Sequence, residues 1–263
     1  MTRLLPFIIS LIWTTGTAAS ADLSAAITIR GHVQTLHLYG DRGHPPVVVA
    51  SGDGGWIHLA PHVAEALAAH GFFVIGFDVK AYLESFTSAR ASLTATDVPA
   101  DFAAVVTFAA AGSTERPILA GVSEGAGLSV LAAGDPAIKN QIAGVLCLGL
   151  PDVNELGWRW KDSVIYLTHG VPNEPTFSSA AVIAKVAPLP IAAVHSYRDE
   201  FAPIAEIERV LASAGEPKRL WIVNASDHRF SDNIQDCDRR VFDAVGWIQA
   251  HPATALASGE ERQ

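Results

Sequence analysis

The stretch LAGVSEGAGLS, residues 119–129, holds a serine, Ser123, with a glycine two positions away on each side. An apolar run precedes it at residues 117–120, and an Ala- and Gly-rich segment with helical spacing follows at residues 125–133. This order of strand, turn and helix is the context required of a nucleophilic serine on a tight turn. The flanking glycines fit such a turn because the backbone is too crowded there for side chains. We therefore predict that Ser123 is a nucleophile; a Gly-rich turn without chemistry is the alternative.

Apolar, β-branched runs alternate along the whole chain with segments of helical spacing. The predicted strands cover residues 47–50, 72–77, 117–120, 142–148, 164–167, 191–194 and 220–223, and the predicted helices residues 62–69, 100–110, 125–133, 204–214 and 239–250. Continuously apolar strands separated by helices indicate a mostly parallel sheet covered on both faces. Residues 27–39 alternate more, which predicts one or two antiparallel strands at the start of the sheet. We predict one α/β domain over residues 22–255, followed by a disordered tail at 256–263.

Composition limits the class of protein. The 263 residues are 49% hydrophobic and 17% charged, which is typical of a globular chain. The net charge is -9 and no run of Lys or Arg occurs, so a nucleic-acid partner is not expected. Cys147 and Cys237 are the only cysteines, and the sequence leaves open whether they pair.

The first 21 residues have the layout of a secretory signal peptide. Arg3 precedes the apolar residues 4–13, and small residues at 17–21 end in an A-x-A site. We predict export, with cleavage before Asp22; an uncleaved anchor is the alternative. No other stretch approaches the length of a membrane span, so the mature chain is predicted to have none.

A nucleophilic serine needs a base, and the base needs an acid that orients it. On an α/β sheet of this kind these residues follow the serine in the order acid, then histidine. His228 lies in a polar loop directly after the predicted strand 220–223, whereas His251 follows a helix near the end of the chain. Asp199 follows the predicted strand 191–194, and its neighbour Glu200 is the alternative acid. We predict His228 as the base and Asp199 as the acid.

The negative charge that develops on the substrate needs backbone N–H donors. We predict two donors: the N–H of Glu124, directly after the serine, and the N–H of Asp53, in the loop SGDGGW at residues 51–56. Gly54 is the alternative to Asp53 as a donor. The alternative for the loop as a whole is a plain turn with no part in the site. Gly54, Gly55 and Trp56 are weaker candidates for substrate contact, and Trp56 either walls the pocket or caps the core. The Glu124 carboxylate would disfavour anionic substrate groups, or it only faces solvent or the helix terminus.

The string Ser51-Gly52-Asp53-Gly54-Gly55-Trp56, the stretch AEALAAHG at 64–71 and the serine turn at 121–125 resemble the α/β-hydrolase domain of the VirJ/AcvB family of bacterial virulence proteins. The resemblance covers about residues 45–150. It implies Ser123 as nucleophile, a role for the loop at 51–56, a periplasmic location, and cleavage of the aminoacyl ester of lysyl-phosphatidylglycerol. The chain departs from the usual family turn, G-Y-S-F-G-A-D, at Val122, Glu124 and Gly127. The segment at 199–203 resembles ordinary esterases more than the virulence proteins.

These observations predict an exported serine hydrolase acting on a carboxylic ester, with a phospholipid headgroup carrying an aminoacyl ester as the preferred substrate. A generic esterase for small substrates and a non-catalytic binding protein of the same fold are the alternatives. No cofactor is predicted. No metal is predicted either, because His58 and His62, spaced four apart, have no third ligand nearby in the sequence.

Overall fold

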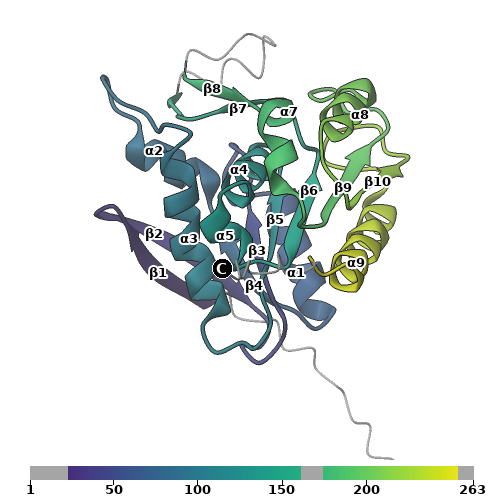
Figure 1. Cartoon of the computed structure of the whole chain (residues 1–263), viewed down its shortest axis with the longest axis horizontal. Coiled ribbons are helices and arrows are strands. Elements are labelled where there is room, and N and C mark those ends of the chain that lie inside the picture. The colour runs from purple at the N-terminus through teal and green to yellow at the C-terminus, as the bar shows by residue number, and fades with distance from the viewer. Residues whose placement is uncertain (1–22, 161–173, 254–263) are drawn as a thin grey trace, which may run out of the picture.

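The computed structural model describes residues 23–160 and 174–253 (Figure 1). The predicted signal peptide, the tail at 256–263 and the predicted strand at 164–167 lie outside these residues.

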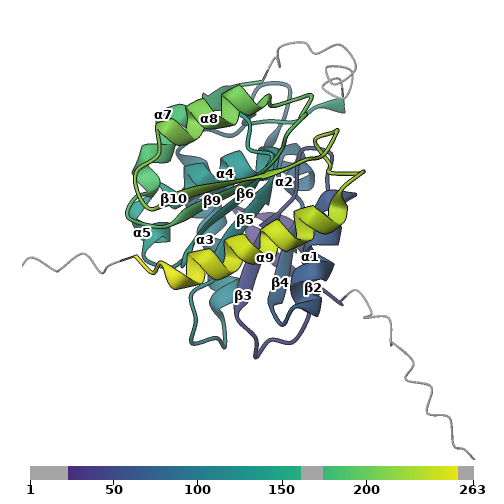
Figure 2. The ribbon, with the colours of Figure 1, turned by 90° about the vertical axis from the view of Figure 1, so that its right-hand side faces the viewer.

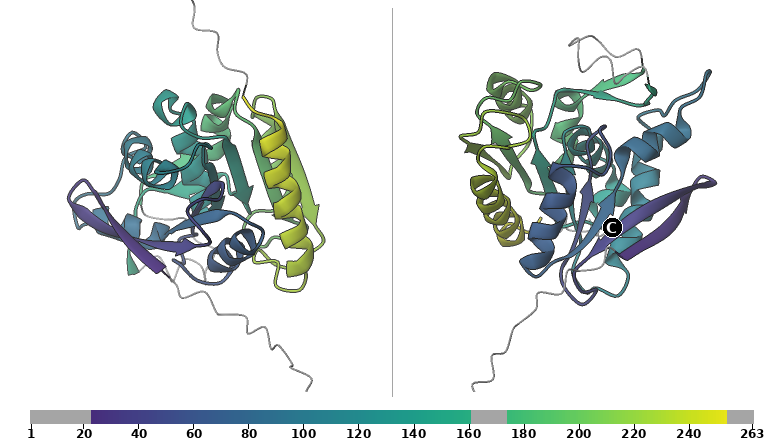
Figure 3. Two further views of the ribbon diagram at one scale, coloured as in Figure 1. Left: turned by 90° about the horizontal axis from the view of Figure 1, so that it is seen from below. Right: turned by 180° about the vertical axis from the view of Figure 1, so that it is seen from behind.

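The central element of the described part is an eight-stranded sheet in the order β1-β2-β4-β3-β5-β6-β9-β10. Its strands are β1 (Leu23–Ile29), β2 (His32–Tyr39), β3 (Pro46–Ala50), β4 (Phe73–Phe77), β5 (Ile118–Val122), β6 (Gly144–Leu148), β9 (Ile191–Ser196) and β10 (Lys218–Val223). Strands β1, β2 and β4 pair antiparallel, and all other pairs are parallel. The predicted mostly parallel sheet is confirmed, and residues 27–39 form parts of two antiparallel strands. Seen from behind, the β1–β2 hairpin lies at one side of the molecule and α9 (Ile234–Ala250) at the other (Figure 3, right).

Helices cover both faces of this sheet. α1 (Leu59–Ala69) and α9 pack on one face and contact each other, as Figure 2 shows. α3 (Asp97–Ala110), α4 (Glu124–Ala133) and α8 (Ile204–Ala212) pack on the opposite face. Viewed from below, the sheet runs between these two groups of helices (Figure 3, left).

The apolar runs of the sequence explain this arrangement. In β3, Val47 and Val49 face the core under α1 and α9, whereas Val48 and Ala50 face the core under α3 and α4. Because successive side chains point to opposite faces, a strand between two helical layers must be apolar at every position. All five residues of β3 are buried.

The structure adds short elements that the sequence analysis did not predict. They are α2 (Val79–Phe86), α5 (Pro136–Lys139), the hairpin β7 (Val153–Glu155) and β8 (Thr176–Ser178), α7 (Ser179–Val182) and the 3₁₀ helix η2 (Ile183–Val186). Asp78 caps α2, since its carboxylate accepts a hydrogen bond from the N–H of Ala81 at 3.1 Å. Short segments of this kind lack the periodicity on which the sequence-based assignment depends.

Within residues 23–160 and 174–253, no helix combines the length and the apolar composition that crossing a membrane requires. Cys147 in β6 and Cys237 in α9 are both buried free thiols, so the structure shows them unpaired.

Candidate active site

Ser123 sits at the junction of β5 and α4 in a strained backbone conformation. Its φ is 51° and its ψ is -120°, a region that residues with a side chain rarely adopt. A Cβ on Gly121 would overlap the carbonyl group of Gly125, and a Cβ on Gly125 would overlap the carbonyl oxygens of Ala50 and Ser51. Both glycines of the sequence pattern are therefore required by close backbone approach.

The strained turn is held by backbone hydrogen bonds. The N–H of Ser123 donates to the carbonyl oxygen of Leu148 at 2.8 Å, and its own carbonyl oxygen accepts from the N–H of Ala126 at 2.8 Å. The Ser123 side chain does not cap α4. Its hydroxyl is therefore not committed to the helix, and the residue lines a pocket of about 450 Å³.

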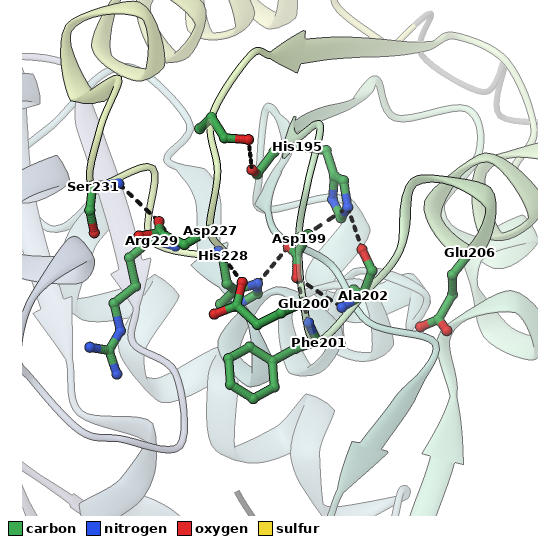
Figure 4. A network of polar contacts seen from close by, with 12 residues as sticks. His195, Asp199, Glu200, Phe201, Ala202, Glu206, Asp227, His228, Arg229 and Ser231 are labelled. Atoms are coloured by element: carbon green, nitrogen blue, oxygen red, sulfur yellow. Dashed lines mark hydrogen bonds and ion pairs between the residues drawn. The ribbon is translucent and has the colours of Figure 1, made fainter. Parts of the chain in front are cut away.

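His228 lines the same pocket and is bonded to Asp199. Strand β10 leads into the His228 loop and β9 into the Asp199 loop, and these parallel strands end at the same edge of the sheet as β5. His228 Nδ1 lies 2.6 Å from Asp199 Oδ2 (Figure 4). A carboxylate only accepts, so Nδ1 is the donor of this bond, and Nε2 is the nitrogen left to act as a base. No hydrogen bond joins His228 to Ser123 among the described residues; a base and its nucleophile often tighten only when substrate is bound.

Asp199 is buried but ionised. Burial acts to raise the pKa of its carboxyl, but the hydrogen bond and charge of His228 and the N–H of Ala202 together lower it below its ordinary value. Its second oxygen, Oδ1, accepts from the N–H groups of Phe201 and Ala202 at 2.9 and 2.8 Å. All of these contacts favour the charged form.

Glu200, the alternative acid, has a different partner. Its Oε2 accepts from the backbone N–H of His228 at 2.7 Å, whereas Asp199 bonds the imidazole ring. Of the two candidates, Asp199 thus has the geometry of an acid that orients the base.

Gly149 is a site residue that the sequence analysis missed. It has a φ of +60°, and a Cβ there would lie 2.6 Å from Cε1 of His228. The imidazole therefore occupies the space that a side chain at position 149 would fill. The signal in the sequence was a glycine directly after the apolar residues of β6, where the strand leaves the sheet.

The loop at residues 51–56 lies beside the serine turn. A Cβ on Gly52 would lie 3.4 Å from Cβ of Ser123. Ser51 holds the loop, because its N–H donates to the carbonyl oxygen of Phe77 at 2.9 Å and its hydroxyl accepts from the N–H of Val79 at 3.0 Å. Asp53, Gly54, Gly55 and Glu124 all line the pocket with Ser123 and His228. The predicted oxyanion donors, the N–H groups of Asp53 and Glu124, stay a prediction.

Trp56 lies apart from this group. Its ring fills the space above Gly76 on β4, stacks on His37 with the centroids 4.9 Å apart, and donates from Nε1 to the Tyr39 hydroxyl at 3.1 Å. It is not among the residues that line the pocket. The structure therefore supports the alternative that Trp56 caps the core and does not wall the pocket.

Two carboxyl groups of the pocket have raised pKa values. Burial raises the pKa of Asp53 to about 6, although the charge of His228 and backbone hydrogen bonds oppose the shift. Burial, then the charges of Asp53 and Glu155, raise the pKa of Glu124 well above its ordinary value. Glu124 Oε1 accepts from the N–H of Glu155 at 2.7 Å, which ties the turn to β7.

Apolar side chains form part of the mouth of the pocket, beside the exposed residues His58 and Arg229. Ile57, Val153 and Phe201 line it with exposures of 51, 56 and 45%. Phe201 packs edge-on against the His228 ring with the centroids 5.5 Å apart. Val153 and Glu155 come from β7, a short strand that no pattern in the sequence predicts. Apolar side chains at the mouth, with carboxyl groups and a serine deeper in the pocket, suit a substrate with both apolar and polar parts.

Comparisons with known proteins agree with this fold. Among solved structures the fold is similar to the α/β hydrolase GrgF from Penicillium sp. sh18, at 14% identity over 89% of this chain and 100% of that chain, with a TM-score of 0.66. It is similar to Est1E from Butyrivibrio proteoclasticus, at 15% identity over 86% of this chain and 99% of that chain, with a TM-score of 0.63. It is also similar to a membrane phospholipase A described as a novel bacterial virulence factor, at 12% identity over 87% of each chain, with a TM-score of 0.62. These likenesses show the α/β-hydrolase fold.

No curated protein matches the sequence significantly. The family of bacterial virulence proteins called VirJ matches residues 46–200, which is more than half of the chain. The resemblance seen in the sequence is thereby confirmed, and the matched region extends beyond the serine turn to the Asp199 loop. The chain belongs to the VirJ family of bacterial virulence proteins.

Proposed function

We propose that this protein is an exported serine hydrolase that cleaves a carboxylic ester. One observation carries the proposal: Ser123, on a strained turn, and His228, bonded through Nδ1 to buried Asp199, line the same pocket. The α/β-hydrolase fold, which esterases share, supports it. A binding protein would have no need of all three residues in this order.

In the proposed reaction His228 Nε2 accepts the proton of the Ser123 hydroxyl as the oxygen attacks the ester carbonyl carbon. Asp199 orients His228 and stabilises the imidazolium that forms. The N–H groups of Asp53 and Glu124 donate to the carbonyl oxygen as it becomes negative. The C–O bond to the leaving alcohol breaks, and His228 returns the proton to that alcohol. Water, deprotonated by His228, then attacks the acyl carbon; the C–O bond to Ser123 breaks, the acid leaves, and His228 returns the proton to the Ser123 oxygen.

The substrate we favour is the aminoacyl ester of an aminoacylated phospholipid such as lysyl-phosphatidylglycerol, in the periplasm. The pocket carboxylates of Asp53 and Glu155 are suited to the ammonium groups of an aminoacyl substrate. The apolar side chains of Ile57, Val153 and Phe201 at the mouth are suited to the lipid that carries the ester. The family of the chain and its predicted export support the same compartment.

Labelling with a fluorophosphonate probe tests the chemistry. The mature protein is expected to be labelled at Ser123, and Ser123→Ala to remain unlabelled although folded. A folded wild-type protein that resists the probe would leave a non-catalytic binding protein as the better explanation.

Incubation with vesicles that contain lysyl-phosphatidylglycerol tests the substrate. Release of free lysine by the wild type, and none by Ser123→Ala, is the expected result. Hydrolysis of small p-nitrophenyl esters without release of lysine would instead identify a generic esterase.

A further inference from the structure

We infer that His195 is a positioning residue that holds the Asp199 loop in the geometry required by the base. This inference rests on the proposed function, because it concerns the same acid and base. His195 lies on β9, four residues before Asp199, and its side chain is fully buried. The proposed reaction itself gives it no role, although it is an ionisable group beside the site.

The contacts of His195 reach Asp199 through Ala202. His195 Nε2 lies 2.7 Å from the carbonyl oxygen of Ala202. The N–H of the same residue, Ala202, donates to Asp199 Oδ1 at 2.8 Å. Ala202 is thus held on both of its polar groups, and this fixes the rotation of the carboxylate. Its other oxygen, Oδ2, then meets His228 Nδ1 at 2.6 Å, and Figure 4 shows both imidazoles pointing toward Asp199.

The protonation state of His195 fits this role. A carbonyl oxygen only accepts, so Nε2 carries the proton and Nδ1 a lone pair. That Nδ1 is buried and has no hydrogen-bond partner among the described residues. Burial lowers the pKa of His195, which keeps the ring neutral. A neutral ring, with Nε2 3.7 Å from Asp199 Oδ2, does not compete with His228 for the carboxylate.

The unpartnered nitrogen also indicates that His195 does more than pack in the core. A buried polar atom without a partner is unfavourable, because it has lost its hydrogen bonds to water. An apolar side chain of similar size would avoid that cost but would leave the Ala202 carbonyl without its donor. The contact to Ala202 is therefore the feature that only a donor at this position supplies.

Substitution at His195 separates these roles. His195→Leu is expected to lower kcat by about 10- to 100-fold with little change in KM, because a misplaced acid affects the reaction and not binding. His195→Gln, whose amide N–H is able to reach Ala202, is expected to stay close to wild type. Val194→Ala, on the same strand but in the opposite core, is the control for a general loss of stability. Should His195→Leu fail to fold, His195→Asn takes its place, since its side chain is too short to reach Ala202.

A double-mutant cycle tests whether His195 acts through Asp199. In an Asp199→Asn background the effect of His195→Leu on the rate of fluorophosphonate labelling is expected to disappear, because residues in one network are not additive. The inference would be overturned if the two substitutions slowed labelling independently, so that their fold-changes multiply in the double variant. A folded His195→Leu protein with wild-type kcat would overturn it as well.

A measurement without turnover keeps this inference separate from the proposed function. The proton on His228 Nδ1, in a short bond to a carboxylate, is expected to give a far-downfield NMR signal. The signal should persist in His195→Gln and Val194→Ala and shift or vanish in His195→Leu. An unchanged signal in His195→Leu contradicts the positioning role, whereas a wild type without esterase activity contradicts only the proposed reaction.

Discussion

At the scale of single residues, the turn at Ser123 depends on two glycines that leave no room for a side chain. Gly121→Ala is expected to destabilise the domain by about 3 kcal/mol or more, because its Cβ would overlap backbone atoms, which cannot rotate away. Gly246→Ala is the matched control: Gly246 is exposed on α9 and a Cβ there meets nothing within 4 Å. This control should gain about 0.5–1 kcal/mol. Urea denaturation measures both, and equal stabilities would show that the turn is not tight.

Glu124 provides a prediction on pH. Its pKa is raised in the folded protein, chiefly by burial, so the folded chain keeps a proton that the unfolded chain loses as the pH rises above 4.5. The free energy of unfolding therefore falls with rising pH on account of this group. Glu124→Gln stays neutral and still accepts from the N–H of Glu155, so its melting temperature should exceed that of wild type at pH 8.

The difference in melting temperature should shrink as the pH is lowered toward 4, where Glu124 is protonated in both states. Glu65→Gln, at an exposed position of α1, is the matched control. A difference that stays constant between pH 4 and pH 8 would mean that Glu124 ionises in the folded protein as it does in the unfolded chain.

At the scale of elements, Asp101 joins α3 to α2 and to the β1–β2 turn. Its buried carboxylate accepts from the Tyr82 hydroxyl at 2.6 Å and from two nitrogens of Arg30 at 2.8 and 2.6 Å. Asp101→Ala should lower the free energy of unfolding by about 3 kcal/mol, because it leaves the buried Tyr82 hydroxyl without a partner. Tyr82→Phe should cost only about 1 kcal/mol, since Asp101 keeps Arg30.

Urea titrations of the two single variants and the double variant measure this coupling. The cost of Tyr82→Phe should become small in the Asp101→Ala background, because the hydroxyl no longer has a partner to lose. Additive costs would show that the three elements are held together by their apolar packing alone.

At the scale of the whole molecule, the two cysteines report on the two cores. Cys147 lies in the core under α3 and α4, and Cys237 in the core under α1 and α9. Burial raises the pKa of both thiols, that of Cys237 to about 12. Neither thiol should react with a water-soluble disulfide reagent in the folded protein.

Cys147→Ala keeps only the thiol of Cys237, and Cys237→Ala keeps only that of Cys147. In each variant the remaining thiol should become reactive at the urea concentration at which the same variant loses half of its circular dichroism signal. A single sheet shared by both cores makes their unfolding cooperative. A reaction of either thiol well before the loss of secondary structure would indicate that one helical layer opens by itself.

The local pattern of the chain was enough to predict the α/β class and the serine turn. Continuous apolar runs require burial on both faces, and Gly121 meets a steric limit within the turn itself, from the carbonyl group of Gly125. The fold and the family are accordingly confirmed. Asp199 and His228 are predictable from the sequence because each follows a strand of a parallel sheet, and parallel strands bring their carboxyl ends to one edge.

Tertiary structure decided what adjacency in the sequence leaves open. Asp199 and Glu200 are neighbours with the same chemistry, and only the direction of the loop gives one the ring of His228 and the other its backbone N–H. Trp56 belongs to a glycine-rich loop beside the site, yet its ring packs on the sheet, because Gly76 has no side chain and leaves room for it there. Sequence alone determines which segments must be buried or must bend, because these are local properties. Which side chains finally touch depends on how distant elements pack, and no local pattern encodes that.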